Sequence, residues 1–173
     1  MILTIVGFAL PGVLVGTMIT IIDEIETSKW REYYYKQLLW DVYDDYVIAL
    51  RDIEATTDLI RAFYYAQYLP SPQKEMWHVE WKAKGSPEAY AEDAMEQLDD
   101  ILKRLESIQW PEDFRDDVSQ LKVYINELRG LVLQIQEIAK KNSLTRSDVE
   151  DAETLLDLFS SYNHRIYTII KNI

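Results

Sequence analysis

Apolar side chains recur at alternating intervals of three and four residues along most of the chain after residue 38, and this spacing limits the fold to packed helices. An α-helix completes one turn in 3.6 residues, so positions three and four apart form one stripe on its surface. A strand would instead repeat every second residue. The sequence therefore predicts an all-α fold. Its first stripe consists of Leu39, Val42, Tyr46, Ala49, Ile53, Thr56, Ile60 and Phe63.

Helix-ending and helix-starting residues divide the pattern into four helices. Ser86 is a suitable N-cap and Pro87 a suitable first residue for the second helix. The residue before Pro111 disfavours helical geometry, which separates the second helix from the third. Ser147 and Glu150 have the spacing of a capping box for the fourth. The predicted helices cover about residues 24–68, 87–109, 111–141 and 147–172.

Four amphipathic helices with short connections predict an antiparallel, up-down-up-down four-helix bundle over residues 41–173. Leu128 lies in the middle of the third stripe and is expected in the core. Asn163 lies on the fourth stripe, where a polar residue usually sets register or partner choice at a cost in stability. The alternative is a slightly rotated helix that leaves Asn163 at the rim.

Residues 1–22 carry no charged side chain. As a helix they would be about 33 Å long, enough to cross a bilayer core. A cleaved signal peptide is the rival interpretation, but it needs a basic start that this sequence does not have. We expect a retained transmembrane anchor. It should continue as a helical stalk through residues 23–40, because residues 23–69 hold no Pro or Gly.

Gly12 and Gly16 form a small-xxx-small pair that would let another membrane helix approach closely. The alternative is that glycine is simply common in membrane helices. Orientation has two opposed indicators. Lys29, Arg31 and Lys36 favour a cytoplasmic bundle by the positive-inside rule. The acidic residues that directly follow the anchor favour the extracytoplasmic side, which we adopt.

The stalk is aromatic on every face, which a solvated helix does not need. Its candidate partner-binding residues are Trp30, Tyr33, Tyr34, Tyr35 and Trp40. Exposed aromatic surface is typical of protein interfaces. The alternative is an aromatic belt at the lipid headgroups combined with packing by the fourth helix.

The connector between the first two predicted helices holds a second set of contact-prone side chains, Met76, Trp77 and Trp81. Trp and Met are favoured at interfaces. The alternative is that the two tryptophans close the end of the bundle that lies away from the membrane.

Composition excludes several classes of function. The net charge of −12 repels nucleic acid phosphates, and the absence of cysteine removes thiolate metal sites and cysteine nucleophiles. Glu75 and His78 form one Glu-x-x-His motif, whereas a di-iron bundle needs two. Neighbouring acids such as Asp99 and Asp100 diverge on a helix. We therefore expect no catalytic residues, metal or cofactor.

The sequence favours a non-enzymatic, single-pass membrane protein that serves as an accessory or scaffold subunit. Its expected partners are membrane lipid, through the anchor, and other subunits of a membrane complex or further copies of itself. A ligand-sensing four-helix bundle is the alternative. That alternative needs polar side chains converging across the stripes, and apart from Thr56 and Asn163 there are few.

The anchor prediction can be tested by intact-mass measurement of the protein extracted from its native membrane. We expect residues 1–22 to be present, because the segment has the length of a span and lacks the basic start of a signal peptide. A mass that lacks about twenty N-terminal residues would contradict the anchor.

Overall fold

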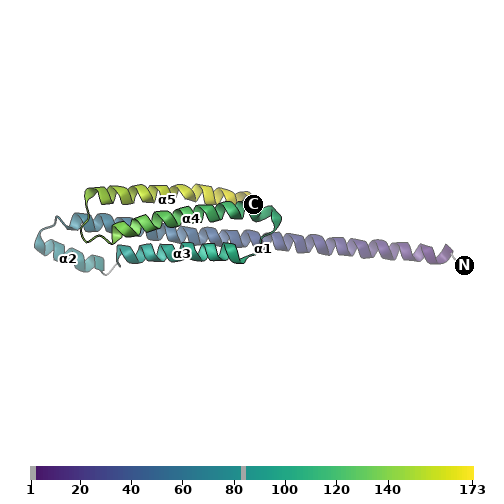
Figure 1. The fold of residues 1–173 in the computed structure, drawn as a ribbon. Coiled ribbons are helices and arrows are strands. Elements are labelled where there is room, and N and C mark those ends of the chain that lie inside the picture. Colours follow the sequence, from purple (N-terminus) through teal and green to yellow (C-terminus); the bar gives the residue numbers. More distant parts are fainter. Residues whose placement is uncertain (1–2, 83–84) are drawn as a thin grey trace. The chain divides into compact units, whose positions relative to one another are not determined.

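The computed structural model describes the backbone of residues 3–82 and 85–173, and the side chains of residues 27–76 and 85–173. This part of the chain is almost entirely helical and contains no strand (Figure 1). The all-α prediction is confirmed. The elements are α1 (Leu3–Ala66), α2 (Ser71–Lys82), α3 (Pro87–Ser107), the 3₁₀-helix η1 (Glu112–Phe114), α4 (Arg115–Ala139) and α5 (Arg146–Asn172).

The chain divides into two compact units, Met1–Leu39 and Trp40–Ile173. We call them the N-terminal unit and the helical unit. The N-terminal unit contains the first part of α1. The helical unit contains the rest of α1 and all later elements.

Neighbouring helices of the helical unit pack in antiparallel pairs (Figure 1). Asp45 on α1 forms an ion pair with Arg104 on α3. Further along α1, the hydroxyl of Thr56 lies 3.3 Å from the carbonyl of Pro87, which comes before Arg104 on α3. The residue numbers run in opposite directions, so the two helices are antiparallel. The same test holds for α3 with α4, α4 with α5 and α1 with α5, through the pairs Asp99–Arg129, Ala91–Gln136, Glu127–Tyr162, Lys141–Asp148, Tyr46–Phe159 and Arg61–Glu153.

The predicted stripes form the core. On α1 the stripe is buried from Leu39 to Ile60, and Phe63 is half-buried. On α4 Leu128 is completely buried. On α5 the stripe turns slightly, because Leu155 is buried and Leu156 only partly so. The core also contains Leu98, Ile101, Leu105, Leu121, Ile125, Val132, Ile135, Ile166 and Ile170.

Asn163 combines the two alternatives that the sequence left open. Its side chain is half-buried at the rim, and its Oδ1 accepts a hydrogen bond from the Tyr43 hydroxyl at 3.0 Å. Beside it, Tyr46 is completely buried, stacks on the Phe159 ring at 5.7 Å and donates its hydroxyl to the Phe159 carbonyl at 3.0 Å. Because these bonds have fixed geometry, they select one register of α1 against α5.

Helix α2 lies in the connector that the sequence analysis interpreted as a break. Proline is tolerated in the first turn of a helix, where its missing N–H has no intrahelical partner to lose. Pro72 occupies that turn, and the amides of Gln73 and Lys74 both donate to the Pro70 carbonyl at 3.0 Å. The prolines therefore begin a helix here.

The start of α3 agrees with the sequence prediction, whereas the start of α5 does not. Ser86 caps α3 as predicted, since its hydroxyl accepts from the Ala89 amide at 3.1 Å. The capping box of α5 is at Thr145 and Asp148, two residues earlier than the predicted box at Ser147. Both boxes fit the sequence pattern, but only Asp148 also meets the ammonium group of Lys141.

In the part of the chain whose side chains are described, no helix has the length and hydropathy that a membrane crossing requires. The side chains of the predicted anchor, residues 1–22, lie outside that part, although the backbone is helical from Leu3. The anchor therefore stays a prediction.

Replacing Leu128 with Asp should unfold the helical unit. A charge without a partner at this completely buried site costs several kcal/mol, against roughly 5–15 kcal/mol for a typical domain. Leu133→Asp is the matched control, because Leu133 lies on the same helix and is 55% exposed. Thermal unfolding followed by circular dichroism should show a much lower midpoint for Leu128→Asp and little change in midpoint for Leu133→Asp. Equal midpoints would mean that the assigned core is wrong.

Candidate functional site

Three exposed aromatic side chains form a stripe on α1 within the N-terminal unit. Trp30, Tyr33 and Tyr34 are 72%, 63% and 59% exposed. Positions i, i+3 and i+4 share one face of a helix. The rings of Trp30 and Tyr33 meet edge to face at a centroid distance of 6.3 Å. We call these three residues the aromatic stripe.

The remaining aromatic residues predicted for the stalk differ from the stripe. Tyr35 is half-buried, and its ring contacts Tyr34 at 5.6 Å. Trp40 belongs to the helical unit, where its ring meets Tyr43 and Tyr167 at 5.9 and 5.8 Å. Because Trp40 is half-buried among these rings, it joins α1 to α5 and is less available to a partner than the stripe.

The other predicted contact residues are only partly described. Met76 on α2 is exposed. The side chains of Trp77 and Trp81 lie outside the described part of the chain, and the predicted packing at Gly12 and Gly16 also falls outside it. Two exposed tyrosines, one in the last turn of α1 and one just after the helix, were not predicted. They are Tyr65 and Tyr68, 61% and 71% exposed, and both contact the ring of Tyr64.

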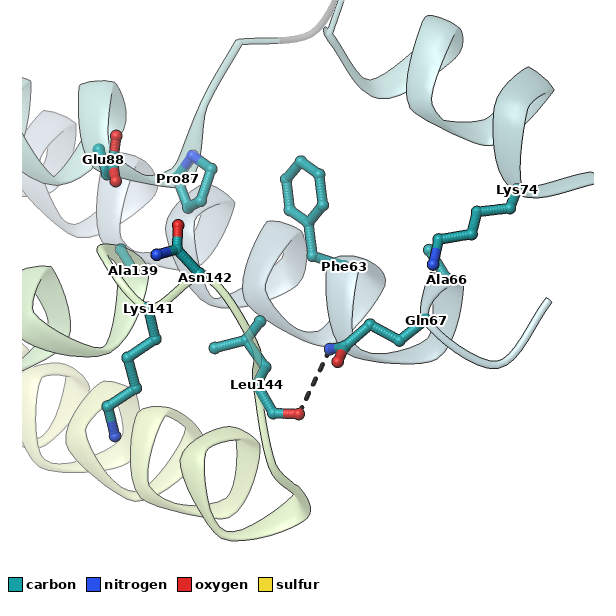
Figure 2. Close-up of a pocket in the computed structure, with 10 residues that line it drawn as sticks. All are labelled: Phe63, Ala66, Gln67, Lys74, Pro87, Glu88, Ala139, Lys141, Asn142 and Leu144. Atoms are coloured by element: carbon teal, nitrogen blue, oxygen red, sulfur yellow. Dashed lines mark hydrogen bonds between the residues drawn. The ribbon is translucent and has the colours of Figure 1, made fainter. Parts of the chain in front are cut away.

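A cavity of about 290 Å³ opens in the helical unit where α1 ends and α3 begins (Figure 2). Its apolar wall comes from side chains at helix ends, namely Phe63, Ala66, Pro87, Ala139 and Leu144. Polar side chains line the rest, namely Gln67, Lys74, Glu88, Lys141 and Asn142. We call it the end cavity.

Two of the polar lining residues are already engaged. The amide of Gln67 donates to the Leu144 carbonyl at 3.3 Å and accepts from the Ser143 hydroxyl at 3.2 Å. Lys141 points away from the cavity in Figure 2 and pairs with Asp148 on α5. Lys74, Glu88 and Asn142 are the remaining polar side chains of the lining.

The pair of Lys141 and Asp148 is the strongest electrostatic feature near the cavity. Asp148 is only 5% exposed, and its Oδ2 accepts from the amide and the hydroxyl of Thr145, both at 2.7 Å. Hydrogen bonds from Lys141 and then Thr145 lower the pKa of Asp148 to about 2. The carboxylate therefore anchors the start of α5 to the end of α4.

The residues considered for metal or catalytic chemistry do not converge. Among the described side chains no three metal-ligating groups come together. Asp99 pairs with Arg129 on the neighbouring helix, and Asp100 pairs with Lys103 in its own. His164 is exposed on α5.

Comparison with known protein families, with characterised proteins and with solved structures finds no match for this chain.

The sequence pattern did not predict the end cavity, because the residues that line it lie where the stripes end. Ala66 and Ala139 continue their stripes with side chains too small to fill the space between helices. The alanines at the last stripe positions were the one feature of the sequence that could have indicated a cavity there. Lys74 could not have been assigned, because the helix that carries it was interpreted as a break.

Asp148→Asn should lower the stability of the helical unit by about 1–2 kcal/mol at neutral pH, which is about 2–8 °C in thermal midpoint. The native pKa lies below the ordinary value of 3.8, so the ionised form stabilises the fold. That contribution is complete above about pH 4 and is lost as the pH falls toward 2.

The measurement is the difference in midpoint between wild type and Asp148→Asn from pH 7 to pH 2. It should narrow between pH 4 and pH 2. Asp151→Asn is the matched control, because Asp151 is exposed on the same helix and should have little effect at any pH. A constant difference down to pH 2 would show that the charge of Asp148 does not stabilise the fold.

Proposed function

We propose that this chain is a non-enzymatic, single-pass membrane protein that serves as an accessory or scaffold subunit of a larger membrane complex. Residues 1–22 would hold it in lipid, with the helical unit on the extracytoplasmic side. The aromatic stripe would bind the partner subunit. The exposure of Trp30, Tyr33 and Tyr34 on one helix face is the observation that carries this proposal.

The size of the stripe is appropriate for the centre of an interface. A large aromatic side chain buries about 150–250 Å² when it is fully covered, so three such residues could supply on the order of 500 Å². A standard interface buries about 800 Å² on each partner. Spacing of i, i+3 and i+4 is the pattern with which a helix enters the groove of a partner.

The chemistry of the stripe also favours a protein partner. Trp and Tyr are enriched among the few residues that dominate binding energy. Lys36 and Glu32 form an ion pair at 2.9 Å on the same helix as the stripe. An apolar centre with a paired polar rim is the usual anatomy of an interface.

The helical unit would then act as a rigid scaffold. Its antiparallel helix pairs support the proposal of an up-down-up-down four-helix bundle. Such a bundle presents a fixed outer surface and needs no catalytic site.

The test is a pair of double substitutions. Tyr33→Ala with Tyr34→Ala removes two of the three residues of the stripe. Tyr65→Ala with Tyr68→Ala removes two similarly exposed tyrosines from the last turn of α1 and the residues just after it. Each full-length variant is extracted in mild detergent, and the proteins that co-purify are identified by mass spectrometry. We expect the first variant to lose its partner by about tenfold or more, since hot-spot tyrosines contribute more than 1 kcal/mol each.

The control variant should keep the partner, and both variants should keep the wild-type circular dichroism, because all four tyrosines are exposed. Normal co-purification of the first variant would overturn the proposal. Equal loss from both variants would place the interface elsewhere on the chain.

A further inference from the structure

We propose that the end cavity binds a small amphipathic monocarboxylate, a molecule with an apolar body and a single carboxylate group, which Lys74 recognises. This site is separate from the aromatic stripe. It would add ligand binding to the proposed role as a subunit.

The volume of the cavity sets the size of the ligand. An apolar cavity of about 150 Å³ accommodates benzene, and pockets for small molecules begin at about 300 Å³. The end cavity, at about 290 Å³, can therefore hold roughly a dozen non-hydrogen atoms. This is the size of an aromatic ring with a short acidic side chain.

The wall of the cavity fits the apolar body. Phe63 projects into the space from α1, and Pro87 lies on the facing wall at the start of α3 (Figure 2). Ala66 and Ala139 leave room between them because their side chains are short. Burial of apolar surface on these four residues would provide most of the affinity, at about 25 cal/mol for each Å².

Lys74 selects the charge of the ligand. It reaches the cavity from α2, beside Ala66, and no carboxylate of the described residues lies within ion-pair distance of its ammonium group. The second lining ammonium group, on Lys141, is already paired with Asp148. An ammonium group that no carboxylate of the described residues pairs favours an anionic group on the ligand.

Glu88 limits the ligand to a single negative charge. Its side chain lines the cavity at the side away from Lys74 (Figure 2). A dicarboxylate long enough to fill the space would place its second anion near Glu88, and like charges repel. Asn142, whose amide lies near Pro87 in Figure 2, can bond a neutral polar group instead.

The experiment uses the full chain in lipid nanodiscs and a fluorinated phenylpropionate followed by fluorine NMR. Empty nanodiscs correct for uptake by lipid. We expect saturable broadening at one ligand per chain. Lys74→Gln should weaken binding by about tenfold, as expected for the loss of one charge-assisted contact. Lys122→Gln on α4 removes a lysine that does not line the cavity and should leave the affinity unchanged.

The matching fluorinated phenylpropylamine tests the sign of the charge. We expect it to bind at least tenfold more weakly than the acid. Equal or tighter binding of the amine would overturn the proposal and assign the charge selection to Glu88. Broadening no greater than in empty nanodiscs, or equal affinity of wild type and Lys74→Gln, would also overturn it. Failure here leaves the co-purification test of the aromatic stripe unaffected.

Discussion

The burial of one face of α1 is the contact on which the rest of the helical unit depends. α1 forms antiparallel pairs with both α3 and α5, and each pair is held by a buried hydroxyl as well as by apolar packing. The hydroxyl of Tyr46 donates to the Phe159 carbonyl of α5. The hydroxyl of Thr56 donates to the carbonyl of Asp52 in its own helix, and it also lies 3.3 Å from the Pro87 carbonyl of α3. Burial raises the pKa of Tyr46, which keeps its hydroxyl protonated as a donor. Because an unpaired buried hydroxyl is costly, these bonds favour one register over shifted alternatives.

Charge is arranged so that an acidic chain can still pack its helices. Three arginines join neighbouring helices, Arg104 to Asp45, Arg61 to Glu153 and Arg129 to Asp99, at 2.6–2.8 Å. Each partly exposed pair contributes little by itself, about 0–1 kcal/mol. Their combined effect is to neutralise three carboxylates where helices meet. At Asp52, burial and then the negative charge of Asp93 raise the pKa of the carboxyl group. This shift shows that the ionised form is disfavoured at that position.

The sequence predicted the parts of this structure that periodicity controls. It predicted the all-α fold, the buried stripe of α1 and the burial of Leu128, because burial on a helix repeats every three to four residues. It placed the start of α5 two residues too late, since Thr145 and Ser147 both satisfy the capping pattern and only the tertiary pair of Lys141 with Asp148 distinguishes them. It missed α2, because a proline in the first turn of a helix looks in sequence like a proline that ends one. It assigned Trp30, Tyr33, Tyr34 and Trp40 alike to partner binding, which stays a prediction, whereas Trp40 packs against the rings of Tyr43 and Tyr167.

The two candidate surfaces differ in what keeps them available. The rings of the aromatic stripe are exposed on one face of α1. The free energy of burying their apolar surface is therefore gained only when another molecule covers them. The end cavity lies where core stripes finish in alanine at positions 66 and 139, and small side chains leave room between helices. Leaving it open forgoes stability, since filling a void with apolar atoms usually stabilises a fold. Forgone stability beside Lys74, which pairs with no carboxylate of the described residues, supports the proposal that the cavity serves a ligand.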